Sequence, residues 1–258
     1  MDRLLLRTRA AAWLAFFVLC LGSWAMLYVM ARDMGVGPLG FPRMSMDGDM
    51  AMGGTDMTRL LPLFGMWAIM MAAMMLPTFV PTARVFMDLI EAEIARPVGL
   101  WGLATGYVWV WLGVAWILAG AQVLFVRLGL TGVMGQSLSL WFSAALLLAA
   151  GAYQFTALKE FCAERCRSPM GMFLQRFAPG LRGGIRLGLR QGIYCAGCCW
   201  GLMAIGFAGG TMSLLWMGLA TLLMVLEKLP EIGRWLTVPI GLGLLGLGTW
   251  VGWLALTA

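Results

Sequence analysis

The chain contains no histidine in its 258 residues. Histidine is the commonest general base in catalysis and the commonest metal ligand in proteins. Its absence argues against a hydrolase built on a Ser/His/Asp set and against a haem protein of the usual kind. The chain also lacks a nucleotide-binding motif, so it does not drive any transport by ATP hydrolysis itself. These absences favour a protein that is not an enzyme.

Charged residues are scarce: they form 12% of the chain, whereas hydrophobic residues form 61%. Soluble domains average about 25% charged and about 45–50% apolar residues. Several apolar stretches approach or exceed the ~20 residues that a helix needs to cross a bilayer. The composition predicts an all-α, polytopic transmembrane helical bundle, with residues 1–258 as a single membrane domain. The net charge of +6 needs no nucleic acid, because membrane proteins collect Lys and Arg next to anionic cytoplasmic lipid.

We predict seven spans and a cytoplasmic N-terminus. The first apolar run follows Arg3, Arg7 and Arg9. It is longer than the h-region of a signal peptide and has a poor cleavage site, so we expect a retained helix. The predicted spans are residues 10–31, 60–83, 98–127, 137–157, 190–208, 211–227 and 236–256.

Basic residues set the predicted orientation. Segment 158–189 contains Lys159 and several arginines, and we interpret it as a basic cytoplasmic loop. Four spans separate it from the basic N-terminus, so the two assignments agree. Segment 32–59 then becomes an extracytoplasmic Met-rich loop. In a bacterium this topology corresponds to a multi-pass protein of the inner (plasma) membrane, with the loop in the periplasm.

Sulfur is abundant where histidine is missing, with 22 Met and 6 Cys. Thioethers and thiolates are soft ligands that select Cu(I). The Met-rich loop is Gly-rich and acidic, and its methionines follow no helix or strand period. Packing therefore does not explain them, although chance or contact with the membrane surface remains an alternative. The candidate ligands in this loop are Met44, Met46, Met50 and Met52.

A second group of methionines lies in the predicted span 60–83. Met66, Met70 and Met74 are four residues apart and share a helical face, with Met71 and Met75 beside them. This arrangement is similar to the thioether ladder of eukaryotic copper permeases, but ordinary packing between helices also explains it. Two prolines, at positions 77 and 81, are expected to kink or end the helix nearby.

The cysteines fall mostly on the predicted cytoplasmic side, where thiols stay reduced. A C-x-x-C-C segment places three thiols on one helical face, and another pair is spaced i, i+4. We expect the two groups to converge and bind Cu(I), or less favourably Zn(II); burial as small packing residues is the alternative. Cys20, alone in the first span, is interpreted as packing. The candidate ligands here are Cys162, Cys166, Cys195, Cys198, Cys199 and Met203.

Two charged pairs, Lys159-Glu160 and Glu227-Lys228, stand at predicted membrane edges, where such residues usually anchor a helix. Glu227 is the candidate for a functional role, because an ionisable group near the interior of a bundle is costly.

Three segments together resemble a bacterial family of predicted metal-binding integral membrane proteins (domain of unknown function 2182). They are the WAIMMAAMMLP segment at 67–77, the YQFTALK segment at 153–159 with its following cysteines, and the YCAGCCW segment at 194–200 with Glu227-Lys228. The resemblance implies a multi-helix membrane protein with a metal site. One departure is Ser213, where the family often has Asn after Met212, so Met212 remains only a candidate ligand.

The leading hypothesis is a protein that handles Cu(I), transferring or importing it across the inner membrane through Met sites and then Cys sites. One alternative is a structural or assembly subunit of a larger membrane complex. Another is a membrane thiol oxidoreductase built on Cys195 and Cys198. Expected partners are membrane lipid, with a copper chaperone, a copper enzyme or a larger membrane complex left open, and no nucleic acid.

Overall fold

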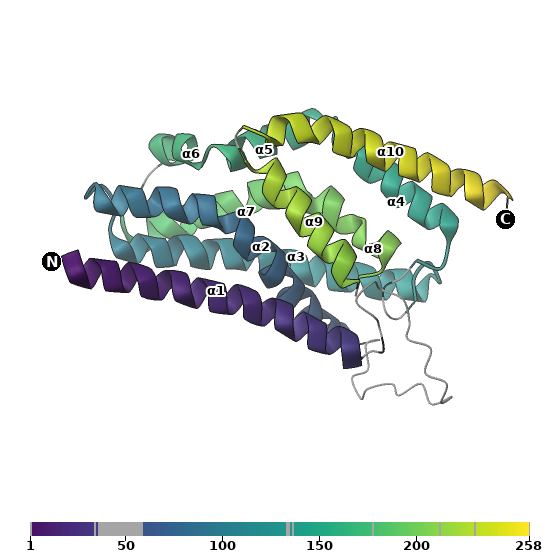
Figure 1. Cartoon of the computed structure of the whole chain (residues 1–258), viewed down its shortest axis with the longest axis horizontal. Coiled ribbons are helices and arrows are strands. Elements are labelled where there is room, and N and C mark those ends of the chain that lie inside the picture. The colour runs from purple at the N-terminus through teal and green to yellow at the C-terminus, as the bar shows by residue number, and fades with distance from the viewer. Residues whose placement is uncertain are drawn as a thin grey trace.

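A computed structural model describes residues 2–33, 35, 59–132, 135, 137–176, 178–211, 213–229 and 231–257. The described chain is helical and contains no strand, only one isolated bridge between Thr131 and Ser137. The all-α prediction is therefore confirmed. The helices are α1 (Asp2–Asp33), α2 (Leu60–Glu91), α3 (Pro97–Arg127), α4 (Leu140–Tyr153), α5 (Ala157–Arg167), α6 (Pro169–Arg176), α7 (Gly180–Ala204), α8 (Gly206–Gly209), α9 (Leu214–Glu227) and α10 (Gly233–Thr257), as labelled in Figure 1.

Five helical stretches in the described chain are long and apolar enough to cross a membrane: α1, α2, α3, α10 and the α7–α8 stretch Gly180–Gly209. Helices α4 and α5 together make a sixth if they are one span, bent by 64° at their junction. Helix α9 is apolar but has only 14 residues. Each of the seven predicted spans therefore coincides with a helix, while the count of seven crossings stays a prediction.

Two boundaries differ from the predicted spans for local reasons. Helix α7 begins at Gly180, ten positions before the predicted start, because its first turns pack against α3 through Gly184 and Gly188. The segment predicted as a cytoplasmic loop, 158–189, thus consists largely of helices α5, α6 and the first turns of α7. Thr156 caps the N-terminus of α5 by accepting from the Lys159 amide at 3.3 Å, which separates α5 from α4.

Helix α2 does not end at its two prolines, contrary to one expected outcome; it continues through Pro77 and Pro81 to Glu91. Pro77 has no amide hydrogen, so the carbonyl of Ala73 loses its helical donor. The indole of Trp24 in α1 donates to that carbonyl at 3.1 Å. The Ala73 carbonyl therefore takes part in a contact between α1 and α2 and is not exposed as a ligand for a membrane site.

Helices α3 and α7 run parallel and pack with their backbones in close approach. A Cβ added to Gly184 would collide with the carbonyl oxygen of Gly99, and one added to Gly188 would collide with that of Leu103. Small residues spaced four apart allow this approach between membrane helices. The packing brings Tyr107 of α3 against Gly188, about two turns before Cys195 of α7.

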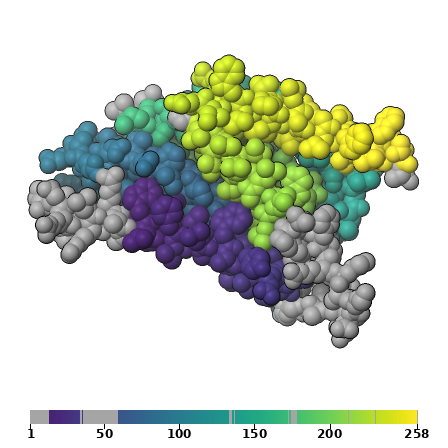
Figure 2. All heavy atoms as spheres, in the orientation of Figure 1, coloured from purple at the N-terminus to yellow at the C-terminus, as the bar shows by residue number. Residues whose placement is uncertain are grey.

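The outer surface of the bundle is apolar. Helices α1, α9 and α10 form much of the face shown in Figure 2. Their exposed side chains include Val18, Leu222 and Trp235, the last 82% exposed. The interior, in contrast, contains buried Lys159, Glu227 and Lys228. This inversion of the soluble pattern fits a lipid environment outside and a polar site inside.

Candidate metal centre

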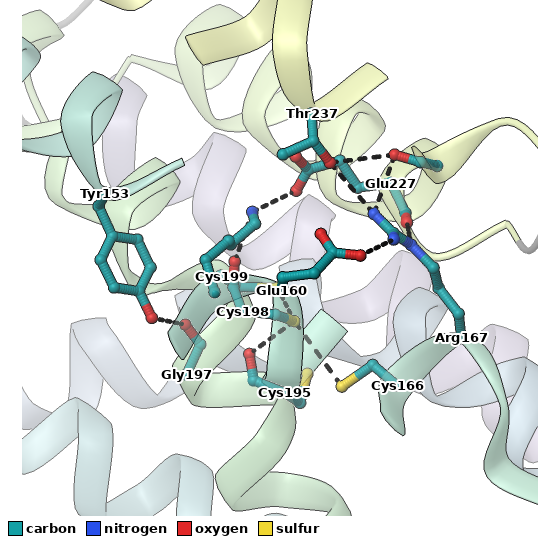
Figure 3. A network of polar contacts seen from close by, with 12 residues as sticks. Tyr153, Glu160, Cys166, Arg167, Cys195, Gly197, Cys198, Cys199, Glu227 and Thr237 are labelled. Atoms are coloured by element: carbon teal, nitrogen blue, oxygen red, sulfur yellow. Dashed lines mark hydrogen bonds and ion pairs between the residues drawn. The ribbon is translucent and has the colours of Figure 1, made fainter. Parts of the chain in front are cut away.

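Four cysteine sulfurs meet between α5 and α7 (Figure 3). Cys195, Cys198 and Cys199 lie on one face of α7, and Cys166 approaches from α5. The Sγ of Cys198 is 3.3 Å from the Sγ of Cys199 and 3.7 Å from that of Cys166. Cys198 also donates from its Sγ to the carbonyl of Cys195 at 3.2 Å. All four are free and buried, so the predicted convergence of the two cysteine groups occurs through Cys166.

Cys162, the other predicted member, takes a different position. Its sulfur lies beside Gly197, where an added Cβ would be only 2.6 Å away. The Tyr153 hydroxyl donates to the Gly197 carbonyl at 2.6 Å on the same stretch of α7. Gly197 therefore gives the Cys162 side chain room to pack, and the structure does not place Cys162 among the four sulfurs.

The Cys195 sulfur has the most polar surroundings of the cluster. Lys228, at the end of α9, donates to it from Nζ at 2.7 Å. The Tyr107 hydroxyl is 3.3 Å from the same sulfur, and Thr78 Oγ1 is 3.9 Å away. A thiolate is the form of cysteine that binds a metal, and a buried negative charge needs a nearby partner. The Lys228 ammonium supplies that partner.

In the two predicted edge pairs, Lys159-Glu160 and Glu227-Lys228, the charged sequence neighbours do not form ion pairs with each other. Lys159 Nζ instead donates to Glu227 Oε2 and to the carbonyl of Cys198, both at 2.8 Å. Arg167 Nε donates to the Glu227 carbonyl at 2.9 Å, and its guanidinium lies 3.6 Å from Glu160. One ion pair thus joins α5 to α9, and hydrogen bonds to backbone carbonyls join α5 to α7 and to the end of α9, directly beside the thiols (Figure 3).

The space enclosed by the thiols leaves no room for a water molecule. It is lined by Cys166, Cys198, Cys199 and Met224, together with Ala163, Glu227 and Lys228. Glu227 Oε1, unlike its Oε2, is buried without a hydrogen-bond partner among the described residues. An unsatisfied buried carboxylate oxygen is costly, and this one lies at the edge of the cluster.

The five methionines of α2 that were predicted as ligands are all buried, and the structure divides them. Met70, Met71 and Met74 line a cavity of about 200 Å³, together with the predicted Met203 of α7 and with Met217 of α9. Met66 and Met75 pack in the core outside that lining, and Met75 Sδ accepts from Thr78 Oγ1 at 3.7 Å. The predicted loop ligands Met44, Met46, Met50 and Met52, and the candidate Met212, lie outside the described residues.

Sequence reasoning missed several residues of the site, namely Lys228, Tyr107, Thr78, Met217 and Met224. Lys228 carried a usable signal, because a lysine at the end of an apolar helix needs a partner. The others look like ordinary packing residues until the helices are placed. Ser213, noted as a departure from the family pattern, caps α9 by accepting from the Trp216 amide at 3.4 Å.

The sulfur spacing can be compared with that of a metal thiolate. A tetrahedral centre with metal–sulfur bonds of about 2.3 Å separates its sulfurs by about 3.8 Å. The Cys166–Cys198 distance of 3.7 Å matches this value, whereas the Cys198–Cys199 distance of 3.3 Å is shorter. Among the described residues, no three Cys, Asp or Glu side chains are already arranged to hold an ion. The thiols are nevertheless donors of the kind that soft metals prefer.

The fold and the cluster together define a helical protein with several membrane-length helices and a buried thiol centre. A family model described as PpoB2, copper chaperone, matches residues 64–251. This range covers most of the chain, so the protein belongs to that copper chaperone family, and its general role is copper handling. No curated protein and no solved structure matches the chain significantly.

Proposed function

We propose that this protein binds Cu(I) at the cluster of Cys166, Cys195, Cys198 and Cys199 and transfers it within a bacterial inner membrane. The observation that carries the proposal is the convergence of four free, buried thiols in a chain that belongs to a copper chaperone family. The resemblance to predicted metal-binding integral membrane proteins supports it further.

The softness of the thiol donors and the match to a copper chaperone family favour Cu(I) over Zn(II). Four thiols equal the ligand number of a closed structural zinc site, and the 3.3 Å contact between Cys198 and Cys199 does not separate the two metals. Soft thiolates select Cu(I), which accepts fewer ligands. Two of the thiols can therefore hold the ion while the others receive or release it, which suits transfer better than permanent storage.

The proposed topology places the N-terminus in the cytoplasm and the Met-rich loop outside. The parallel packing of α3 and α7 supports the alternation of crossings, because a chain with seven crossings puts these two helices in the same direction; the basic residues carry the choice of the cytoplasmic side. Copper would then meet the loop methionines first, the α2 methionines next and the thiols last. Weak thioether sites followed by stronger thiolates give a downhill order, provided that no step binds too tightly.

The test is a Cu(I) competition titration of the purified protein against a chromophoric chelator, under reducing and anaerobic conditions. The triple variant Cys195→Ser/Cys198→Ser/Cys199→Ser should lose the tight site. Cys20→Ser is the matched control, because Cys20 lies in α1 and should keep it. X-ray absorption of the copper-loaded protein should show a sulfur-only shell. Equal Cu(I) affinity in the wild type and the triple variant refutes the proposal.

The burial of the cluster argues against the thiol oxidoreductase hypothesis. Redox-active cysteines are usually accessible to their partner, whereas Cys195 is fully buried and Cys198 is 5% exposed. A Cys195–Cys198 disulfide that forms and is reduced during turnover, detected by mass spectrometry, would favour that hypothesis. Stable co-purification with a larger complex and without copper would favour the structural-subunit hypothesis.

A further inference from the structure

The methionine-lined cavity is separate from the thiol cluster. Its thioethers come from three helices: α2 supplies Met70, Met71 and Met74, α7 supplies Met203, and α9 supplies Met217. No single helix periodicity produces this convergence. It results from α2, α7 and α9 turning side chains into one common space, so these five side chains form a built set.

The chemistry of the lining restricts what the cavity can bind. Among the described residues that line it, none is charged, and nearly all of the surface is apolar. The indole N–H of Trp67 is engaged by Gln122 Oε1 at 2.8 Å. Hard cations require several oxygen ligands, and among the described lining residues only Thr211 has an oxygen in its side chain. Thioether sulfur is the donor that the cavity offers in quantity, and it selects soft cations.

The cavity adjoins the thiol cluster along two helices. Met203 is one helical turn beyond Cys199 on α7, and both side chains are buried. On α2, Met74 is one turn before Thr78, which contacts the Cys195 sulfur at 3.9 Å. On both α2 and α7, an ion held by the thioethers is therefore about one helical turn from the thiol cluster.

We propose that this cavity is a second soft-metal site, which holds a monovalent cation by thioethers alone, with Met217 as a ligand from α9. The site rests on the proposed Cu(I) function and deepens it, since it gives the cargo a holding place before the thiols. The volume of about 200 Å³ exceeds that of a bare ion. The flexible methionine side chains close around the ion by rotation about their three torsions.

The experiment uses Ag(I), a redox-inert soft cation, on the full-length protein with all six free cysteines changed to Ser, so that no thiol competes for the ion. In this background the site should still bind about one equivalent of Ag(I). Adding Met74→Leu and Met217→Leu should abolish that equivalent. Leucine conserves volume and is well tolerated in cores, so the helical fold, checked by circular dichroism, should persist.

The matched control is Met66→Leu in the same background, because Met66 is equally buried but lies outside the cavity lining. It should leave Ag(I) binding unchanged, and any contribution from the loop methionines is common to both variants. Equal loss in the control, no loss in Met74→Leu/Met217→Leu, or uptake of only xenon or acyl chains by the cavity would overturn the proposal. If the parent protein binds Cu(I) at its thiols while the Ser background binds no Ag(I), only this second site is refuted.

Discussion

The thiol cluster and the methionine cavity occupy neighbouring stretches of α2, α7 and α9, yet they are built in opposite ways. The cluster leaves no room for water and is surrounded by Lys159, Glu227 and Lys228. The cavity is open enough for a small ligand and has no charged lining residue among those described. Ionic contacts fix the thiols in place, whereas flexible thioethers leave the cavity adaptable. The proposed strong binding of a soft ion by the thiols and its proposed weak binding by the thioethers therefore take place in different surroundings.

The largest expected effect follows removal of the carboxylate beside the cluster. Glu227→Ala leaves the Lys159 ammonium, which is 1% exposed, without its ionic partner at 2.8 Å. Breaking one side of a buried ion pair typically costs about 3–5 kcal/mol. We expect a marked fall in the thermal unfolding temperature of the detergent-solubilised protein. The double variant Glu227→Ala/Lys159→Met should recover most of the loss, and an unchanged temperature in the single variant would contradict the interpretation of this pair.

A more selective change separates the two regions. Lys228→Met removes the ammonium 2.7 Å from Cys195 Sγ and substitutes an apolar chain of similar length. Loss of a group that orients or compensates a metal ligand commonly reduces affinity about 10–100-fold. We expect that reduction for Cu(I) at the cluster, measured by chelator competition. Ag(I) binding by the cavity, measured in the Cys→Ser background, should stay the same; a parallel loss at both sites would show that they are one site.

The sequence predicted the class of fold because lipid-facing and core residues alike are apolar over long stretches. It also predicted which cysteines of α7 share a face, since spacing i, i+3, i+4 settles that without tertiary structure. It could not decide between Cys162 and Cys166. Both lie on α5 one turn apart, and only the packing against Gly197 and Cys198 separates them.

The cavity shows why the rest required three dimensions. The periodicity of α2 placed Met66, Met70 and Met74 on one face. In the structure, Met70 and Met74 line the cavity, whereas Met66 packs in the core outside it. Met217 lies on another helix, and no local pattern links it to α2. Lys159 and Glu227 are 68 positions apart, so sequence spacing alone pairs each with its charged neighbour.

The smallest expected effect concerns the stability of the cavity itself. Met217→Leu conserves volume next to a space of about 200 Å³, so no overpacking arises, and the cost in unfolding free energy should stay below about 1.5 kcal/mol. Met66→Ala, in contrast, opens a hole in tightly packed core, for which about 2–5 kcal/mol is typical. Thermal unfolding of both variants without metal tests this difference. If Met217→Leu destabilises the protein as much as Met66→Ala, Met217 is a packing residue, and its thioether is not free to turn toward an ion.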